Sequence, residues 1–261
     1  MIKQRLWLSN TYITVENVTY LYNHMGPPLG DGENIKDRSC GLVVAYNYIE
    51  GGEYLIDMVD GHWTDKPNYF STHVYGNLMV KIRDSPNYAV THYGGDLGNT
   101  SVYRNGTLYF YHNTVVSYHF PKATALFFLS TDAQHVDARN NVFWSNHTAN
   151  FLLDSAAGSA FLDGNFMQDS WQVCPAAHGQ KCSVARLGEI VNGTSPGFDA
   201  EPSQLRPDGG VPYADYHLSP TSVCRNKAVA LAPEAHPVTR QYGKGGLPRA
   251  SARDLGAFDS A

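Results

Sequence analysis

Short apolar stretches that each contain or flank a single asparagine recur along this chain. The aligned positions, seen in segments such as VAYNYIEGG, VYGNLMVKI and YFYHNTVVS, are Asn17, Asn47, Asn77, Asn113, Asn141 and Asn165. Each asparagine follows a strand-like stretch and precedes another apolar residue by one or two positions. Asparagine often marks a turn, but an amide buried without a partner costs about 1–3 kcal/mol. The recurrence therefore predicts a common structural partner.

The spacing of these asparagines predicts a coiled fold. They recur about every 24 to 36 residues, which leaves room for two or three short strands in each repeat. Such a repeat suits a β-solenoid, whose coils stack at the strand spacing of about 4.8 Å. Equivalent asparagines then lie above one another, and their amides can hydrogen-bond along the stack. We therefore expect an all-β solenoid with an internal asparagine ladder.

The repeats resemble the right-handed parallel β-helix of the pectin-lyase-like superfamily over roughly residues 6–172. The closing segments SPGFDAEP, DYHLSPTSVCRNKA and DLGAFD resemble the ending of many proteins of that class. The resemblance implies a single-stranded right-handed parallel β-helix whose irregular C-terminal tail packs along the outside. We expect one domain, with β-helix coils in residues 1–172 and a C-terminal coil with a loop-rich tail in residues 173–261.

The composition fits such a fold and excludes some partners. Apolar residues make up 43% of the 261 residues and charged residues only 16%, so a sizeable core can form. The formal net charge is −5 and no basic cluster is present, so we expect neither a nucleic-acid partner nor an acidic membrane surface. No apolar stretch approaches the roughly 20 residues that cross a bilayer.

The cysteines and the first residues bear on location and assembly. Cys174 and Cys182 flank the loop PAAHGQK and form a candidate disulfide, whereas Cys40 lies in strand-like sequence and reads as a buried thiol. An oxidising compartment is favoured, so we expect a secreted or periplasmic protein, although MIKQRLWLSN is not a signal peptide. No amphipathic helix before Leu6 caps the solenoid, which predicts self-association through that end.

The charged segment 31–61 resembles polysaccharide lyase family six, the alginate lyase and chondroitinase B group. ENIKDRS aligns with that family's E-x-I-S-x-K-S stretch, which places Arg38 on the family's lysine and Lys36 two residues earlier. LIDMVDG aligns with its L-R-H-G strand, so the family's arginine falls near Val59. The resemblance implies an enzyme that cleaves a uronate-containing polysaccharide by β-elimination.

Elimination from a uronate needs a base for the C5 proton and a positive charge beside the carboxylate. Lys36 and Arg38 supply the cations, and Asp57 faces outward with them if Ile56 and Met58 point inward. Arginine normally stays protonated, although the resemblance to pectate lyases keeps a base role open for Arg38. A solvated loop with an internal ion pair is the alternative. Candidate calcium ligands are Asp31, Glu33 and Asp37.

A second candidate site lies in VTHYGGDLGNTSVYRNG, residues 90–106. His92 titrates near neutral pH and is a candidate catalytic acid or base. Gly94 and Gly95 allow a sharp turn that exposes Tyr93 and Asp96. Tyr93 and Tyr103 could stack on sugar rings, and Arg104 could bind a carboxylate through both nitrogens. An ordinary wide loop with packed aromatic residues is the alternative reading.

Two other functions remain open. A glycoside hydrolase on the same scaffold would use two carboxylates such as Asp57 and Asp60, but residues three apart on one strand point to opposite faces unless a turn intervenes. A β-helix that only binds glycan is the other alternative. Five histidines occur singly and are expected to be packed or at the surface: His73, His112, His119, His135 and His147. The favoured expectation is a carbohydrate-active lyase.

Overall fold

The structure is a computed structural model. It describes residues 11–61, 63–118, 123–146, 150–154, 157–175, 182–199, 216–242, 246–250 and 252–259. Residues 1–10, on which the expectation of an uncapped first coil rests, lie outside this part of the chain, as do His119 and His147. No helix within it has the length and apolar character needed to cross a bilayer.

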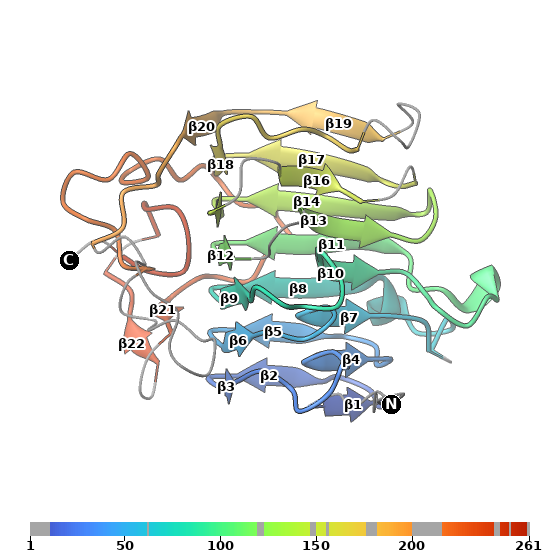
Figure 1. Ribbon diagram of the computed structural model, residues 1–261. Coiled ribbons are helices and arrows are strands. Elements are labelled where there is room, and N and C mark those ends of the chain that lie inside the picture. Colours follow the sequence, from blue (N-terminus) through green and yellow to red (C-terminus); the bar gives the residue numbers. More distant parts are fainter. Residues whose placement is uncertain are drawn as a thin grey trace, which may run out of the picture.

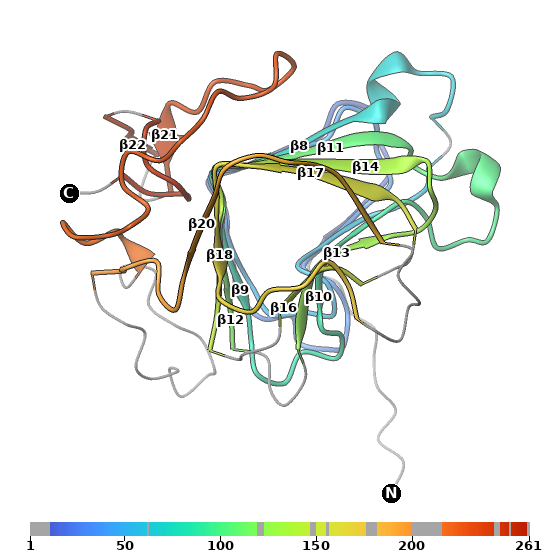
Figure 2. The ribbon, with the colours of Figure 1, turned by 90° about the horizontal axis from the view of Figure 1, so that it is seen from above.

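Nearly all regular structure in the described residues is β, and it forms three long parallel sheets. Successive strands go to successive sheets, and each strand pairs with its counterpart in the next repeat (Figure 1). Seen along the stack, the sheets surround a common interior (Figure 2). This arrangement is compatible with a parallel β-helix.

The first sheet contains six strands in chain order. They are β1 (Thr11–Ile13), β4 (Ile35–Asp37), β7 (Ile56–Met58), β10 (Ala89–Tyr93), β13 (Thr124–Leu129) and β16 (Asn150–Leu153). Five of the predicted site residues lie on this sheet: Lys36, Asp37, Asp57, His92 and Tyr93.

The second and third sheets each contain seven strands. The second is made of β2 (Thr19–Leu21), β5 (Val43–Ala45), β8 (Ser71–Tyr75), β11 (Gly106–Tyr111), β14 (Gln134–Arg139), β17 (Ser159–Asp163) and β19 (Ser183–Leu187). The third is made of β3 (His24–Met25), β6 (Tyr48–Glu50), β9 (Leu78–Lys81), β12 (Thr114–Ser117), β15 (Val142–Ser145), β18 (Asn165–Gln168) and β20 (Ile190–Gly193).

Two single-turn 3-10 helices interrupt the strands in the described chain, η1 (Pro67–Phe70) and η2 (Thr100–Val102).

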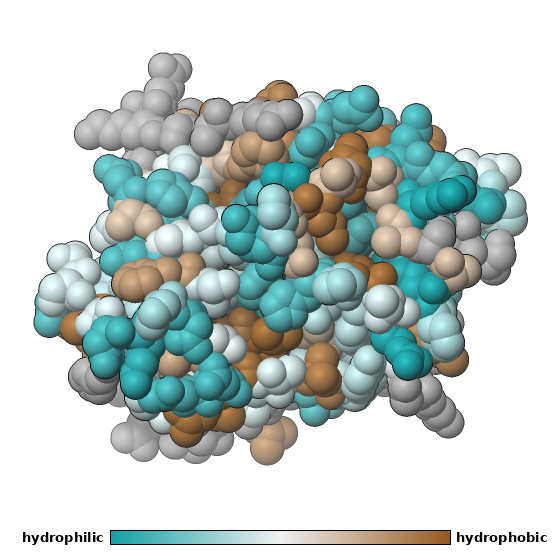
Figure 3. Space-filling model, turned by 180° about the vertical axis from the view of Figure 1, so that it is seen from behind, coloured by the Kyte–Doolittle hydropathy of each residue, from teal (hydrophilic) through white to brown (hydrophobic). Residues whose placement is uncertain are grey.

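Seen from behind, the surface mixes hydrophilic and hydrophobic side chains (Figure 3).

A row of hydrogen-bonded asparagines runs along the corner between the second and third sheets. Its members are Asn23, Asn47, Asn77, Asn113, Asn141 and Asn165, and neighbouring side chains are joined by bonds of 2.9–3.2 Å between Nδ2 and Oδ1. A residue with positive φ precedes each member, for example Gly76 (65°) before Asn77 and His112 (51°) before Asn113. This tight corner turns the chain and points the amide along the stack.

The asparagine row begins at Asn23, so the prediction of Asn17 as its first member was wrong. Asn17 lies at a different corner, has a positive φ of 57°, and accepts a hydrogen bond from Asn68 instead. The other five predicted positions all belong to the row.

The apolar core fills the space between the three sheets with residues such as Ile35, Ile56, Val74, Phe110 and Leu162. A second cluster lies outside the third sheet, where Leu78, Val116 and Phe166 pack against tail residues such as Tyr216 and Phe258. The C-terminal segment, with the short antiparallel pair β21 (Arg240–Gln241) and β22 (Leu247–Pro248), therefore covers the outside of the stack.

The cysteines are arranged as predicted. Cys174 and Cys182 form a disulfide, and Cys40 is a free, buried thiol. Cys224 is also free and buried, and it belongs to the apolar cluster that the tail forms with the third sheet.

Candidate functional site

The outer face of the first sheet carries a row of chemically active side chains. Lys36 pairs in register with Asp57, Asp57 with His92, and His92 with Phe128. Because successive side chains alternate between the two faces of a strand, these four residues project outward together. Ile35, Ile56 and Met58 point into the core instead.

Lys36 forms ion pairs with three carboxylates. Its Nζ contacts Asp57 Oδ2, lies 2.8 Å from Asp96 Oδ2, and lies 3.5 Å from Glu33 Oε1. Burial alone would lower the pKa of Lys36, but the charges and hydrogen bonds of Asp57 and Asp96 outweigh it and raise that pKa. Lys36 is therefore held as an ammonium ion at neutral pH and is a poor base.

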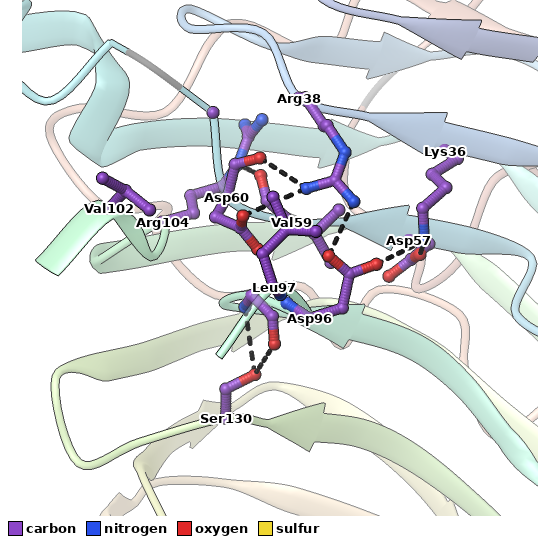
Figure 4. A network of polar contacts seen from close by, with 12 residues as sticks. Lys36, Arg38, Asp57, Val59, Asp60, Asp96, Leu97, Val102, Arg104 and Ser130 are labelled. Carbon is purple, nitrogen blue, oxygen red and sulfur yellow. Dashed lines mark hydrogen bonds and ion pairs between the residues drawn. The ribbon is translucent and has the colours of Figure 1, made fainter. Parts of the chain in front are cut away.

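Arg38 bridges the carboxylates of Asp60 and Asp96. Its Nη1 donates to the Asp60 carbonyl at 2.7 Å and lies 3.1 Å from Asp60 Oδ2, while Nη2 lies 2.6 Å from Asp96 Oδ1. The Asp96 carboxylate thus lies between the two cations (Figure 4). Burial disfavours the charged form of Asp96, but the hydrogen bonds from Lys36 and Arg38 lower its pKa to about 2.

Asp57 and His92 form a tightly packed pair. Asp57 Oδ1 lies 2.7 Å from His92 Nδ1, and the ring stands 5.4 Å from Tyr54 and 4.7 Å from Phe128 between centroids. Burial opposes ionisation of Asp57, yet the hydrogen bond and charge of His92, together with Lys36, lower its pKa. The carboxylate therefore stays ionised and fixes the orientation of the imidazole.

The other ring nitrogen of His92 meets a serine that the sequence analysis did not single out. His92 Nε2 lies 2.8 Å from Ser130 Oγ, and Ser130 directly follows β13. The signal was available in the alignment of repeats, because TALFFLS lies one coil after the strand that contains His92. Phe128, which flanks the imidazole, also follows from that register.

The loop after β10 holds Asp96 over this face. The Asp96 and Leu97 amides donate to Asp60 Oδ1 at 2.7 and 3.4 Å. Asp60 therefore lies on the same side as Asp57, which is the exception that was allowed if a turn intervenes. The physical reason is that the strand ends at Met58, so alternation no longer applies at Asp60.

Three residues predicted to bind substrate are buried, and they lie apart from the outer cluster. Arg104 is 0% exposed, Tyr93 is 0% exposed and Tyr103 is 9% exposed. Tyr93 points inward because His92, its neighbour on the strand, points outward. Its hydroxyl donates to the Asn105 carbonyl at 2.7 Å. Of the four predicted substrate-binding residues, Asp96 is the one that lies in the outer cluster.

Arg104 is an internal structural cation. Its Nη2 lies 3.0 Å from Asp37 Oδ1 and donates to the Ser39 carbonyl at 2.5 Å, and its guanidinium lies 5.5 Å from the centre of the Tyr69 ring. Asp37 is also 0% exposed and accepts from the Ser39 amide at 2.9 Å. This pair connects the first sheet to the loop before β11.

The predicted calcium ligands are not brought together. Asp37 faces the interior and pairs with Arg104, whereas Glu33 lies on the outside and pairs with Lys36. Across the described residues, including Asp31, no group of three or more histidine, cysteine, aspartate or glutamate side chains is arranged to hold a metal ion. Asp37, which was a candidate calcium ligand, is instead a buried carboxylate that pairs with Arg104.

The predicted catalytic residues, in contrast, lie together. Three of them lie on neighbouring strands, Lys36 on β4, Asp57 on β7 and His92 on β10, and Arg38 directly follows β4. Ion pairs through Asp96 and Asp57 connect the four residues.

No family model matches the chain, and no curated protein or solved structure matches it.

Proposed function

We propose that the chain is a right-handed parallel β-helix with an asparagine ladder, of the pectin-lyase-like type. Three observations support this fold: the three parallel sheets in chain order, the row of asparagine amides, and the tail along the outside. In such a scaffold the outer face of one sheet, with the loops beside it, is free to carry a site.

On this scaffold we propose a polysaccharide lyase that cleaves a uronate-containing polysaccharide by β-elimination. The supporting observation is the carboxylate held between Lys36 and Arg38. The structure places the Asp96 carboxylate there, with contacts of 2.8 and 2.6 Å. A uronate carboxylate is the same chemical group, and two adjacent cations would stabilise the charge that develops on it as C5 loses its proton.

His92 is the proposed base. Lys36 is held protonated by its carboxylate partners and Arg38 is a permanent cation, so both serve as charge stabilisers. Asp57 holds Nδ1 of His92, so Nε2, which lies 2.8 Å from Ser130 Oγ, is the nitrogen that would take the proton once that contact opens. His92 is only 4% exposed, so the substrate carboxylate must first displace Asp96 and the loop that carries it.

The carboxylates of the cluster fit hydrolysis less well. A glycosidase needs one protonated carboxyl group as general acid, but the pKa values of Asp57 and Asp96 are lowered by their cationic neighbours. Asp60 is 0% exposed; it pairs with Arg38 and accepts hydrogen bonds from two backbone amides. Hydrolysis and simple glycan binding are therefore the competing outcomes of the test.

The remaining expectations are proposals that accompany this function. The disulfide between Cys174 and Cys182 supports an oxidising compartment, and so a secreted or periplasmic location. A requirement for calcium stays a proposal, and the assay tests it by comparing activity with calcium and with a chelator. Self-association through the first coil concerns residues that lie outside the described part of the chain.

The test is ultraviolet absorbance of unsaturated uronate products. Alginate, pectate, chondroitin and hyaluronan would each be incubated with the protein, with calcium and with a chelator. We expect a rising signal on one polymer that Lys36→Ala and His92→Asn abolish. Lys66→Ala is the matched control, because Lys66 pairs with Glu16 at the surface and lies outside the cluster.

A different result would redirect the proposal. New reducing ends without unsaturated products would mean hydrolysis. Binding to the polymer without products of either kind would mean a glycan-binding protein. Either result would overturn the proposed elimination.

A further inference from the structure

The side chain of Ser130 completes a continuous series of hydrogen bonds on the outer face of the first sheet. Ser130 Oγ lies 2.8 Å from His92 Nε2, and His92 Nδ1 lies 2.7 Å from Asp57 Oδ1. Asp57 and His92 occupy paired positions on neighbouring strands, and Ser130 follows the next strand of the same sheet. Hydroxyl, imidazole and carboxylate are thus held in line by three successive coils.

We propose that Asp57, His92 and Ser130 form a nucleophilic triad that hydrolyses esters, with Ser130 as the nucleophile. The same order of groups activates serine on several unrelated folds, and it is recognised by geometry rather than by position in the sequence. The inference goes beyond the proposed elimination, because it concerns a different bond and does not require a uronate.

The carboxylate behind the imidazole distinguishes Ser130 from Ser71. Ser71 Oγ also lies 2.9 Å from a histidine nitrogen, Nε2 of His73, but His73 Nδ1 is buried with no hydrogen-bond partner. Asp57, in contrast, holds Nδ1 of His92 and can stabilise the imidazolium that forms when Nε2 takes a proton. Ser71 is therefore a matched control within the same protein.

The loop after β10 brings a backbone donor to the nucleophile. The Gly95 amide donates to Ser130 Oγ at 3.1 Å, and Ser130 Oγ donates to the Gly95 carbonyl at 3.1 Å, so the hydroxyl must turn towards His92 Nε2 before it gives up its proton. A Cβ on Gly94, whose φ is +142°, would lie 2.5 Å from Ser130 Oγ, and one on Gly95 would lie 2.2 Å from the Tyr103 ring. The two glycines thus permit an approach that other residues would block.

The reaction is a two-step acyl transfer to water. Ser130 Oγ attacks the ester carbonyl carbon and gives its proton to His92 Nε2. The bond from that carbon to the alcohol oxygen then breaks, and His92 returns the proton to the departing alcohol. Water attacks the acyl-serine in the second step, with its proton passing through His92 back to Ser130 Oγ. The products are an alcohol and a carboxylic acid.

The position of Ser130 suits a small acyl group on a sugar hydroxyl. Ser130 is partly exposed, whereas His92 is 4% exposed. The serine hydroxyl is therefore the part of the triad nearest to solvent. Asp96, which follows Gly95, is held by the cations Lys36 and Arg38. An O-acyl ester on a carboxylate-bearing sugar would place its two functional groups on these two neighbouring parts of the site.

The test is covalent labelling with a fluorophosphonate, a reagent specific for activated serines, read by intact-mass and peptide mass spectrometry. We expect one adduct per chain, located on Ser130, together with release of p-nitrophenol from p-nitrophenyl acetate. Ser130→Ala should abolish both, and Asp57→Asn should slow labelling by about 10³–10⁴-fold. Ser71→Ala should label like the unaltered protein.

Two results would overturn the triad. One is the absence of an adduct on the unaltered protein; the other is an adduct that persists in Ser130→Ala. Thermal unfolding of each variant checks that the fold is intact. The proposed elimination fails or succeeds separately, because labelling and the neutral ester need no uronate, whereas unsaturated products need no nucleophilic serine.

Discussion

The Asp96 carboxylate spans two cations on the outer face of the first sheet, with Oδ2 2.8 Å from Lys36 Nζ and Oδ1 2.6 Å from Arg38 Nη2. The Asp96 side chain is 31% exposed, whereas those of Lys36 and Arg38 are 14% and 9% exposed. Asp96 therefore covers the two cations, and a substrate carboxylate must compete with it for the same contacts.

The first prediction is that Asp96→Asn strengthens binding of an acidic oligosaccharide. The amide cannot neutralise Lys36 and Arg38, so the substrate carboxylate meets two cations whose charge is less compensated. We expect about tenfold tighter binding of an oligouronate, equivalent to about 1.4 kcal/mol. Isothermal titration calorimetry at low and high salt would measure it, and the gain should shrink with salt.

The control for this prediction is Asp65→Asn, because Asp65 is an exposed carboxylate near η1. It should leave the affinity unchanged. Weaker binding by Asp96→Asn would mean that Asp96 itself contacts the substrate and that competition is the wrong description.

The second prediction concerns the centre of the asparagine row. Asn113 Oδ1 accepts from the amide and the side chain of Asn77, both at 3.0 Å, and its Nδ2 donates to the Val74 carbonyl at 2.9 Å. Asn113→Ala leaves these groups buried without partners. Because each costs about 1–3 kcal/mol, we expect a loss of several kcal/mol in the free energy of unfolding, measured by denaturant titration.

Asn23→Ala is the comparison for Asn113→Ala. Asn23 is the first member of the row and is only half-buried, so water can replace part of what its side chain provides. It should cost clearly less than Asn113→Ala. Equal losses at the two positions would contradict the view that burial along the row sets the cost.

The repeat of the fold is readable from the sequence because it is fixed locally. An asparagine after a residue with positive φ, such as Gly76 before Asn77, marks the same corner in coil after coil. The exception is informative: Asn17 itself has the positive φ, whereas in the row the preceding residue has it, and Asn17 lies at another corner and bonds to Asn68. Pattern alone does not distinguish two corners of one coil.

The site is predicted only in part, because its residues meet through strand register. Alternation places Asp57 on the outer face, but His92 was assigned to a second site, and only the strand register shows that it lies in one row with Lys36 and Asp57. Arg104 looks like a surface cation in the sequence, but a buried carboxylate, Asp37, draws it inward. Ser130 is 38 residues away from His92 and has no distinctive motif, so the coil register had to be known first.

The third prediction tests this internal ion pair. Arg104→Met removes the cation and leaves Asp37 charged and buried, at 0% exposure. Breaking a buried pair in this way costs about 3–5 kcal/mol. The double variant Arg104→Met with Asp37→Leu should recover part of that loss, since no unpaired charge remains.

Urea unfolding at neutral pH would measure these losses, with Lys227→Met as the control at an exposed position. A double variant that is less stable than Arg104→Met would show that Asp37 contributes more through its bonds to Ser39 than it costs by its charge.

The last prediction concerns acid stability and His73. This ring is 6% exposed, stacks on Tyr109 at 5.0 Å between centroids, and lies 4.3 Å from the His236 ring. Burial, and then the nearby His236, lower the pKa of His73 from its ordinary 6.5 to about 4. The unfolded chain therefore binds this proton first as the pH falls. The stability that the folded state gains from a neutral His73 is fully present above about pH 6.5 and is lost as the pH falls towards 4.

His73→Phe keeps the stack on Tyr109 but cannot take up a proton. Between about pH 6.5 and pH 4 the unaltered protein should lose about 2–3 kcal/mol more stability than this variant. Denaturant unfolding at several pH values would measure the difference. His135→Phe, at an exposed position, should follow the unaltered protein throughout. Parallel curves for His73→Phe and the unaltered protein would mean that His73 takes up its proton equally well in the folded state.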